Sequence, residues 1–402
     1  MKKIAIILNG ILISVALFGQ QFEEQKTEIT EFDGLAVKVG SDFALQFQSL
    51  DHSSEIDTLY DLVSNFNLPT ANLNINAFLA DGLRLHLRTY LSSRHHVEAW
   101  VKGGYVKIDK LDFISEGFLT DIMDKISIKV GLDEINYGDG HFRRTDNARA
   151  INNPFVGNYI MDAFSTEAFG ELTVQTNGFI GVLGISNGKL NQNVIVTSRY
   201  NHDNKLSFYG KLGYDNQLKD EVRVRLTGSW YINNGASTGS YLYGGDRSGS
   251  RYYSVLVREN EDDNFTSGRF NPRFSQLTAI QVNPFMKLFG LEFFGIYEMA
   301  MGGDNDDKGN FTQIAAELIY RFGRDEQFYG GGRYNIVTGK QTENTEKQNI
   351  NRLNFGLGWF LTENVLAKVE YVRQTYTGDG WSGQLYQGAE FSGLMFEAAV
   401  SF

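Results

Sequence analysis

The sequence has no cysteine, few prolines and no long apolar segment beyond its start. Without cysteine there is no disulfide framework, no thiolate metal site and no acylated lipoprotein cysteine. After residue 18 nothing approaches about 20 consecutive apolar residues, which excludes a helical membrane protein. The formal net charge of -11 argues against nucleic acid as a partner.

The sequence is rich instead in glycine and in aromatic residues. Its 402 residues include 43 glycines, 30 phenylalanines and 20 tyrosines, against 4 prolines. This composition predicts one aromatic-rich β structure rather than several soluble domains.

The N-terminus has the order of a secretory signal. Met1, Lys2 and Lys3 precede an apolar stretch from Ile4 to Phe18. A basic start followed by a short apolar core is typical of a signal peptide, and we expect cleavage after Gly19. A retained anchor is the alternative.

Residues 82–91, GLRLHLRTYL, alternate leucine with Arg84, His86 and Arg88. A helix would scatter these residues around its circumference, whereas a strand sends neighbours to opposite faces. The leucines then face either a soluble core or lipid, with the cations in water.

The end of the chain favours lipid. Residues 393–402, GLMFEAAVSF, alternate apolar residues and close on Phe402. This resembles the signal by which the barrel assembly machinery recognises outer-membrane barrels, so we expect that machinery as a partner during biogenesis. A soluble secreted β-sandwich is the alternative.

Sixteen alternating or apolar runs occur, at residues 35–49, 71–79, 82–92, 96–108, 125–132, 168–176, 178–187, 205–214, 219–232, 274–288, 291–301, 309–323, 327–338, 348–361, 364–376 and 388–402. Tight turns at Asp81-Gly82, Asn177-Gly178, Phe289-Gly290, Arg324-Asp325 and Thr362-Glu363 alternate with longer polar segments.

This pattern predicts an all-β, transmembrane antiparallel β-barrel of about 16 strands, with short periplasmic turns and long extracellular loops. We expect it in the outer membrane of a Gram-negative bacterium, in contact with outer-membrane lipid. Residues 1–19 are then the signal peptide, 20–34 a periplasmic N-terminal segment and 35–402 the single barrel, with residues 233–273 as one extracellular loop. Fourteen or eighteen strands are the alternatives, because boundaries are uncertain by about 2–4 residues.

The faces opposite the apolar ones carry charge. We expect the pore-lining residues to be Arg84, His86, Arg88, Lys125, Lys129, Arg223, Arg225, Glu292, Glu298 and Glu317. Burying so many ions dry would cost several kcal/mol for each unpaired one, so an aqueous channel is predicted. The alternative is that these charges only solvate an inert wall.

Residues 131–167 form the third extracellular loop of this arrangement, and their mixture of charged and apolar residues predicts a folded segment. Its candidate constriction residues are Asp139, His141, Arg143, Arg144 and Arg149. In one interpretation the loop enters the bore and its arginines form an eyelet with Arg84 and Arg88. In the other it is a salt-bridged cap above the pore.

The segment SIKVGLDEINYGDGHFRR, residues 127–144, resembles phosphate-selective porins of the O and P type, with a partial match over residues 125–167. The resemblance implies a sixteen-stranded barrel with an infolded loop. The chain lacks the lysine ladder that this family uses for phosphate, and only Arg84, Arg88, Arg143 and Arg144 stand in its place.

These observations predict an outer-membrane porin-like channel for passive diffusion of small hydrophilic solutes, anions among them. A non-conducting accessory or structural barrel that binds partner proteins in an outer-membrane complex is the alternative. Homotrimer and hetero-complex both stay open. No enzyme, cofactor or metal is expected, because the nearest catalytic pair, His141 with Asp139, is more often a polar turn.

Overall fold

The structure is a computed structural model that describes residues 20–402, apart from residues 25, 27–31, 33, 68, 93–97, 145–148, 190–203, 237–238, 246–250, 260, 263 and 305–306. The predicted signal peptide, residues 1–19, lies outside the described residues.

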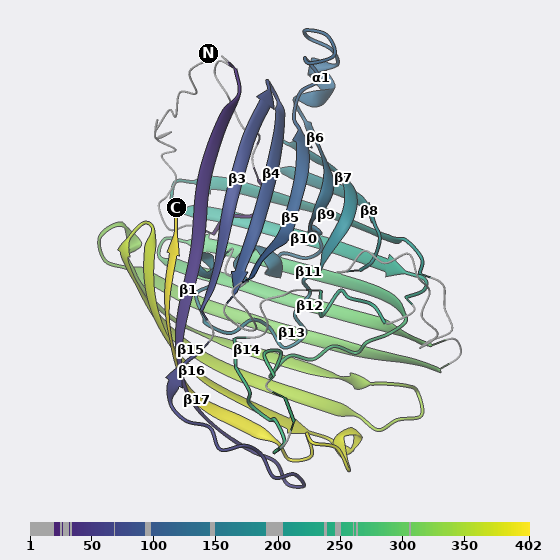
Figure 1. Cartoon of the computed structure of the whole chain (residues 1–402), viewed down its shortest axis with the longest axis vertical. Coiled ribbons are helices and arrows are strands. Elements are labelled where there is room, and N and C mark those ends of the chain that lie inside the picture. Colours follow the sequence, from purple (N-terminus) through teal and green to yellow (C-terminus); the bar gives the residue numbers. More distant parts are fainter. Residues whose placement is uncertain are drawn as a thin grey trace.

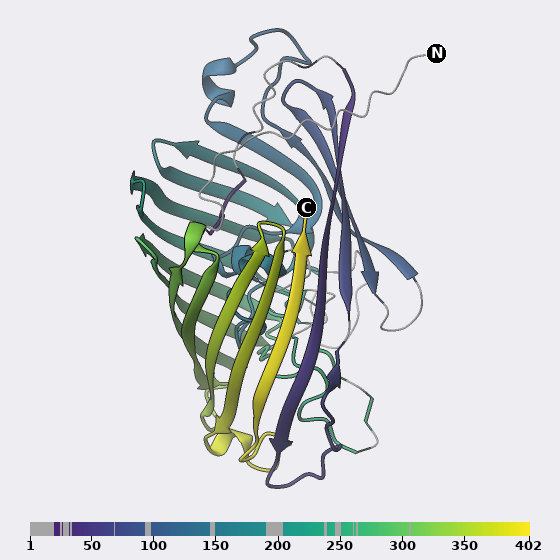
Figure 2. The same cartoon turned by 90° about the vertical axis from the view of Figure 1, so that its left-hand side faces the viewer.

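One antiparallel sheet of 17 strands closes on itself (Figure 1). Its strands are β1 Ala36–Ser53, β2 Asn65–Phe66, β3 Thr70–Ala80, β4 Leu83–Ser92, β5 Glu98–Ile108, β6 Ile126–Glu134, β7 Thr166–Thr176, β8 Phe179–Ser186, β9 Ser207–Lys219, β10 Val222–Asn233, β11 Gln276–Leu288, β12 Leu291–Asp304, β13 Asp307–Phe322, β14 Phe328–Lys340, β15 Gln348–Thr362, β16 Val365–Thr377 and β17 Glu390–Ser401. Closure comes from β1, which pairs with β17 on one side and β3 on the other (Figure 2).

The predicted strands are confirmed. Strand β2 has only 2 residues and was not predicted. The other 16 of the 17 described strands each overlap one of the 16 predicted ranges. The Ser401 N–H, one residue before the C-terminus, donates to the carbonyl of Asn364 in the tight turn between β15 and β16, at 3.0 Å. The C-terminus therefore lies at the end of the barrel that carries the tight turns.

The outer face of the barrel is apolar. On β13, Ile314 and Leu318 are each 53% exposed, whereas the alternating Gln313 and Glu317 are buried. Near the tight-turn ends of β13 to β15, Phe328 stacks on Phe322 at 5.8 Å and on Trp359 at 5.9 Å between ring centroids. An exposed apolar belt edged by aromatic rings is the surface that a lipid bilayer covers.

Helical structure is sparse in the described part of the chain. The helix α1, Thr120–Met123, lies in the connection between β5 and β6, beyond the end of the barrel in Figures 1 and 2. Across the described ranges, no helix has both the length and the apolar character needed to cross a membrane.

Two loops fold into the barrel. We call residues 135–165, between β6 and β7, loop L3, and residues 234–275, between β10 and β11, loop L5. Val156 and Ile160 of L3 and Tyr252 of L5 are fully buried in one apolar cluster with inward-facing strand residues such as Ala279 and Val372. The barrel thus encloses a packed core in addition to its charged wall.

Candidate functional site: the constricted bore

The wall of β16 binds the backbone of L3. The Lys368 ammonium donates to the carbonyls of Ala150, Asn153 and Phe155, at 2.8, 3.0 and 3.0 Å. The Glu370 carboxylate accepts the Val156 N–H at 2.9 Å and the Gly157 N–H at 3.2 Å. An irregular loop inside a barrel has backbone groups that need partners, and the inward-facing charges supply them.

A buried ion-pair network joins L3 to the wall formed by β12 to β14. Arg143 lies between Glu292 on β12, at 3.0 Å, and Glu317 on β13, at 2.7 Å. Glu317 also pairs with Arg333 at 2.5 Å and accepts the Tyr159 hydroxyl at 2.5 Å. The charged side chains of this network are 0% exposed, so each charge depends on its partner rather than on water.

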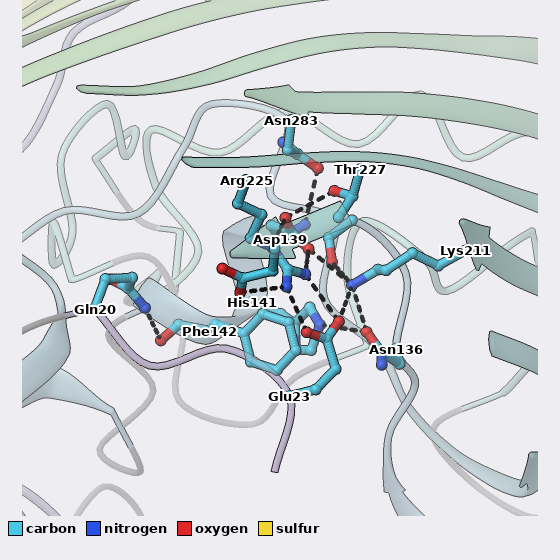
Figure 3. A network of polar contacts seen from close by, with 12 residues as sticks. Gln20, Glu23, Asn136, Asp139, His141, Phe142, Lys211, Arg225, Thr227 and Asn283 are labelled. Atoms are coloured by element: carbon cyan, nitrogen blue, oxygen red, sulfur yellow. Dashed lines mark hydrogen bonds and ion pairs between the residues drawn. The ribbon is translucent and has the colours of Figure 1, made fainter. Parts of the chain in front are cut away.

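A second network surrounds Asp139 (Figure 3). Its carboxylate pairs with Lys211 on β9 and Arg225 on β10, both at 2.8 Å, and accepts the Thr227 hydroxyl at 2.7 Å. Burial alone would raise the pKa of Asp139, but Lys211 and Arg225 hold it well below its usual range. Asp139 is therefore ionised at neutral pH and anchors the start of L3.

The remaining candidate residues of L3 pair locally. Arg144 binds Asp162 within L3 at 2.8 Å, and Arg149 pairs with Glu134 at the end of β6. The His141 Nε2 lies 3.2 Å from the Asn136 Oδ1, and burial lowers the pKa of His141. The catalytic pairing of His141 with Asp139 does not form, because Lys211 and Arg225 take the Asp139 carboxylate.

The arginine eyelet was one of two interpretations of the sequence, and the described ion pairs of its four arginines run to carboxylates instead. L3 enters the bore, but Arg143 and Arg144 are engaged by carboxylates, as the two preceding networks show. Arg84 pairs with Glu24 at 2.5 Å and Arg88 with Asp133 at 3.2 Å. Oppositely charged partners stabilise buried guanidinium groups, whereas a ring of four arginines would leave them uncompensated.

Loop L5 covers L3 from the extracellular side, which the sequence did not predict. The Tyr252 hydroxyl donates to Glu370 at 2.8 Å, and the Tyr243 hydroxyl donates to Glu298 at 2.9 Å. The Phe270 N–H donates to the Ile160 carbonyl of L3 at 2.8 Å. A signal was present, because aromatic residues recur through the segment that was interpreted as one extracellular loop.

The two halves of the bore differ in exposure. Glu292, Glu317 and Arg333, on β12 to β14, have side chains that are 0% exposed, whereas Arg84 and Arg88 on β4 are 11% and 13% exposed. The expectation that all inward-facing charges are solvated is therefore wrong for the β12 to β14 wall, where L3 supplies ionic partners. On the basic wall, solvent therefore reaches Arg84 and Arg88 in part, whereas Lys107 on β5 is buried.

The other predicted pore-lining residues face inward with one exception. His86 lies 2.9 Å from Asn76, the Lys129 ammonium lies 4.8 Å from the Tyr105 ring centroid, and Arg223 pairs with Asp215 at 2.6 Å. Lys125 is the exception, because β6 begins after it and its side chain is exposed at the tight-turn end of the barrel.

Several inward-facing cations were missed by the sequence analysis. Among them are Lys107, Lys211, Arg333 and Arg352, all buried. Alternation along their strands was a usable signal, since each occupies a position of the inward face.

The N-terminal segment also lies in the bore. In the segment that we expect to be periplasmic, the side chains of Gln20, Phe22, Glu23 and Glu24 contact residues inside the barrel. Figure 3 shows Glu23 beside Lys211 and Arg225. Alternation carries no information about a segment outside the sheet, whereas charge complementarity with the wall stabilises it there.

Solved structures of other proteins share this fold, whereas sequence comparisons found no match. No family model and no curated protein matches the chain. Among solved structures, an anion-selective porin from Comamonas acidovorans is 9% identical with a TM-score of 0.56, covering 92% of this chain and 100% of that one. The outer membrane channel DcaP of Acinetobacter baumannii is also 9% identical with a TM-score of 0.56, covering 92% of this chain and 98% of that one.

A trimer form of OmpT, an outer membrane protein of Vibrio cholerae, is 10% identical with a TM-score of 0.54, covering 92% of this chain and 100% of that one. The chain has the fold of an outer-membrane porin barrel. At these identities the likeness concerns the fold alone, so the phosphate-selective type, the subunit assembly and the absence of catalysis stay predictions.

Proposed function

We propose that the protein is a narrow outer-membrane porin for small hydrophilic solutes, with a preference for anions and no catalytic step. The observation that carries the proposal is that Arg84 and Arg88 are partly exposed on the inner wall of a bore into which two loops fold. Water at a basic wall lowers the cost of an anion crossing the membrane, and fixed cations bias which ions enter.

The route that we propose runs along β4 to β6, between that wall and L3. Lys107 and Lys129 add positive charge to the same side of the bore. The anion-selective porin and the DcaP channel that share the fold are consistent with this proposal. Phosphate is one candidate solute, and a homotrimer is one candidate assembly.

A second candidate function is an accessory barrel that conducts nothing and binds partner proteins. The complete burial of the Arg143, Glu292 and Glu317 side chains favours it, because so dense a filling obstructs diffusion. This candidate predicts a closed bore in the isolated protein.

Planar-bilayer recording separates the two. A porin gives discrete ohmic conductance steps, and a reversal potential in a salt gradient reports its ion preference. Folded barrels that insert without any conductance would refute the porin and support the accessory role.

A further inference from the structure

The N-terminal segment places two carboxylates in two separate basic stations of the bore. Glu23 pairs with Lys211 at 3.2 Å and with Arg225 at 2.7 Å, and the Lys211 and Arg225 side chains are 0% exposed. Glu24 pairs with Arg84 at 2.5 Å and lies 4.0 Å from Lys107. The adjacent residues thus reach β9 and β10 in one direction and β4 and β5 in the other.

Phe22 fills an apolar clamp beside the first station. Its ring meets Phe142 of L3 at 5.8 Å and Phe285 of β11 at 5.1 Å between centroids, both edge to face. The Arg225 and Arg223 guanidinium groups lie 4.2 and 5.0 Å from its centroid. Aromatic contacts and cation–π interactions both stabilise a ring in such a site.

The wall at the first station needs the charge that the segment supplies. Lys211, Arg223 and Arg225 face only Asp139 and Asp215 in the described ion pairs, so Glu23 completes the neutralisation. Burial alone would raise the pKa of Glu23, but Lys211 and Arg225 lower it to about 2.

The second station is basic as well. Arg84 and Lys107 both face Glu24, and the Lys107 ammonium also lies 3.2 Å from Asp109 on the wall. Glu24 supplies the second negative charge. Each station therefore holds one carboxylate of the segment between two basic side chains, and we expect it to attract a carboxylate from a solute when the segment is withdrawn.

The segment is anchored by side chains rather than by a strand ladder. Two further contacts hold Gln20, whose amide donates to the Phe142 carbonyl at 3.3 Å and whose carbonyl accepts from Arg223 at 2.7 Å. The covalent link to β1 is through residues 25–35. A tethered ligand of this kind competes with an effective concentration of about a millimolar, so a free solute of the same chemistry has to reach that range to displace it.

We propose that Phe22, Glu23 and Glu24 occupy a binding site for short acidic peptides that carry an aromatic residue, and that the segment is an internal competitor for these solutes. The inference rests on the proposed porin function and names the solute class of the same bore. The first station binds one carboxylate beside the aromatic clamp, and the second station binds the other carboxylate.

The test uses the full-length mature protein in detergent and the probe acetyl-Phe-Glu-Glu-amide, with acetyl-Phe-Gln-Gln-amide as the matched uncharged peptide. The variant Glu23→Gln/Glu24→Gln keeps the shape of the segment and removes its charge. The control Glu116→Gln alters an exposed carboxylate in the connection between β5 and β6. Heat-dependent migration on a denaturing gel establishes that each barrel is folded.

In isothermal titration calorimetry, we expect the acidic probe to bind the double variant at least about tenfold more tightly than the wild type, a difference of about 1.4 kcal/mol. The Glu116→Gln control should match the wild type, and the uncharged peptide should bind neither form. Equal affinity for wild type and double variant, or no binding to the folded double variant, overturns the inference.

Single-channel recording separates this inference from the porin proposal. Block of the current by the acidic probe, stronger in the double variant, supports both. Conductance without probe binding overturns the peptide site and leaves the porin. Probe binding in calorimetry without any conductance overturns the porin and leaves the site.

Discussion

Removal of the Glu317 carboxylate should release L3 from the wall of the bore. Glu317 neutralises both Arg143 and Arg333 and accepts the Tyr159 hydroxyl, with its side chain 0% exposed. In Glu317→Ala, Arg143 keeps Glu292, but Arg333 loses its carboxylate partner. Breaking a buried ion pair from one side costs about 3 to 5 kcal/mol, and the retained Glu292 favours the lower end.

A cost of about 3 kcal/mol corresponds to a rise of about 100-fold in the population of undocked L3, at about 1.4 kcal/mol for each tenfold change. Trypsin reports this population directly. Arg143 and Arg144 are each 1% exposed, so cleavage after them requires the loop to leave the wall. The initial rate of cleavage after Arg143 and Arg144 in the folded, detergent-solubilised variant should therefore rise by about 100-fold over that in the wild type.

The matched control is Glu390→Ala, which removes the carboxylate of an exposed strand pair. Glu390 and Arg373 are 44% and 56% exposed, and such surface pairs contribute about 0 to 1 kcal/mol. Its cleavage rate should stay near that of the wild type. If Glu317→Ala and Glu390→Ala are cleaved equally slowly while both barrels remain folded, the buried network does not hold L3.

Three further changes test other parts of the bore. Replacing both Arg84 and Arg88 by alanine should move the reversal potential in a salt gradient toward cation selectivity, and an unchanged potential would eliminate that wall as the filter. Because Lys211 and Arg225 lower the pKa of Glu23 from 4.5 to about 2, its contribution to docking is complete above pH 4.5 and is lost as the pH falls through about 2. The part of the current that depends on Glu23 should accordingly rise only below pH 4.5 and be absent from Glu23→Gln, and a Glu23-dependent rise that begins near neutral pH would contradict the pairing. Gly157→Ala should raise cleavage in L5 and lower the thermal unfolding midpoint, because its new methyl group would collide with the buried Tyr252 ring, and overpacking of this kind costs about 1–3 kcal/mol. An unchanged midpoint would mean that the two loops are not packed as described.

The barrel itself follows from the sequence because its information is local. Alternation with a period of two marks each strand, and tight turns such as Asp81-Gly82 fix which strand ends lie together. One boundary shows the limit of this reasoning. Lys125 continues the alternation of β6, but the strand begins at Ile126, so the last cation of the pattern lies outside the wall.

The filling of the bore does not follow from local pattern. Arg143 finds Glu317 across 174 residues, and Lys211 finds Asp139 across 72. Such pairs depend on which wall a loop reaches after the barrel closes, and periodicity says nothing about that. The charges of L3 indicate a folded loop, but their partners could only be found in three dimensions.

The most direct test of the porin proposal is the conductance of the purified wild-type protein in a planar bilayer. We predict small, discrete ohmic steps whose reversal potential in a salt gradient favours anions, because the proposed route runs along the partly exposed Arg84 and Arg88. Silent membranes that contain folded, inserted barrels, or steps that favour cations, would contradict the proposal.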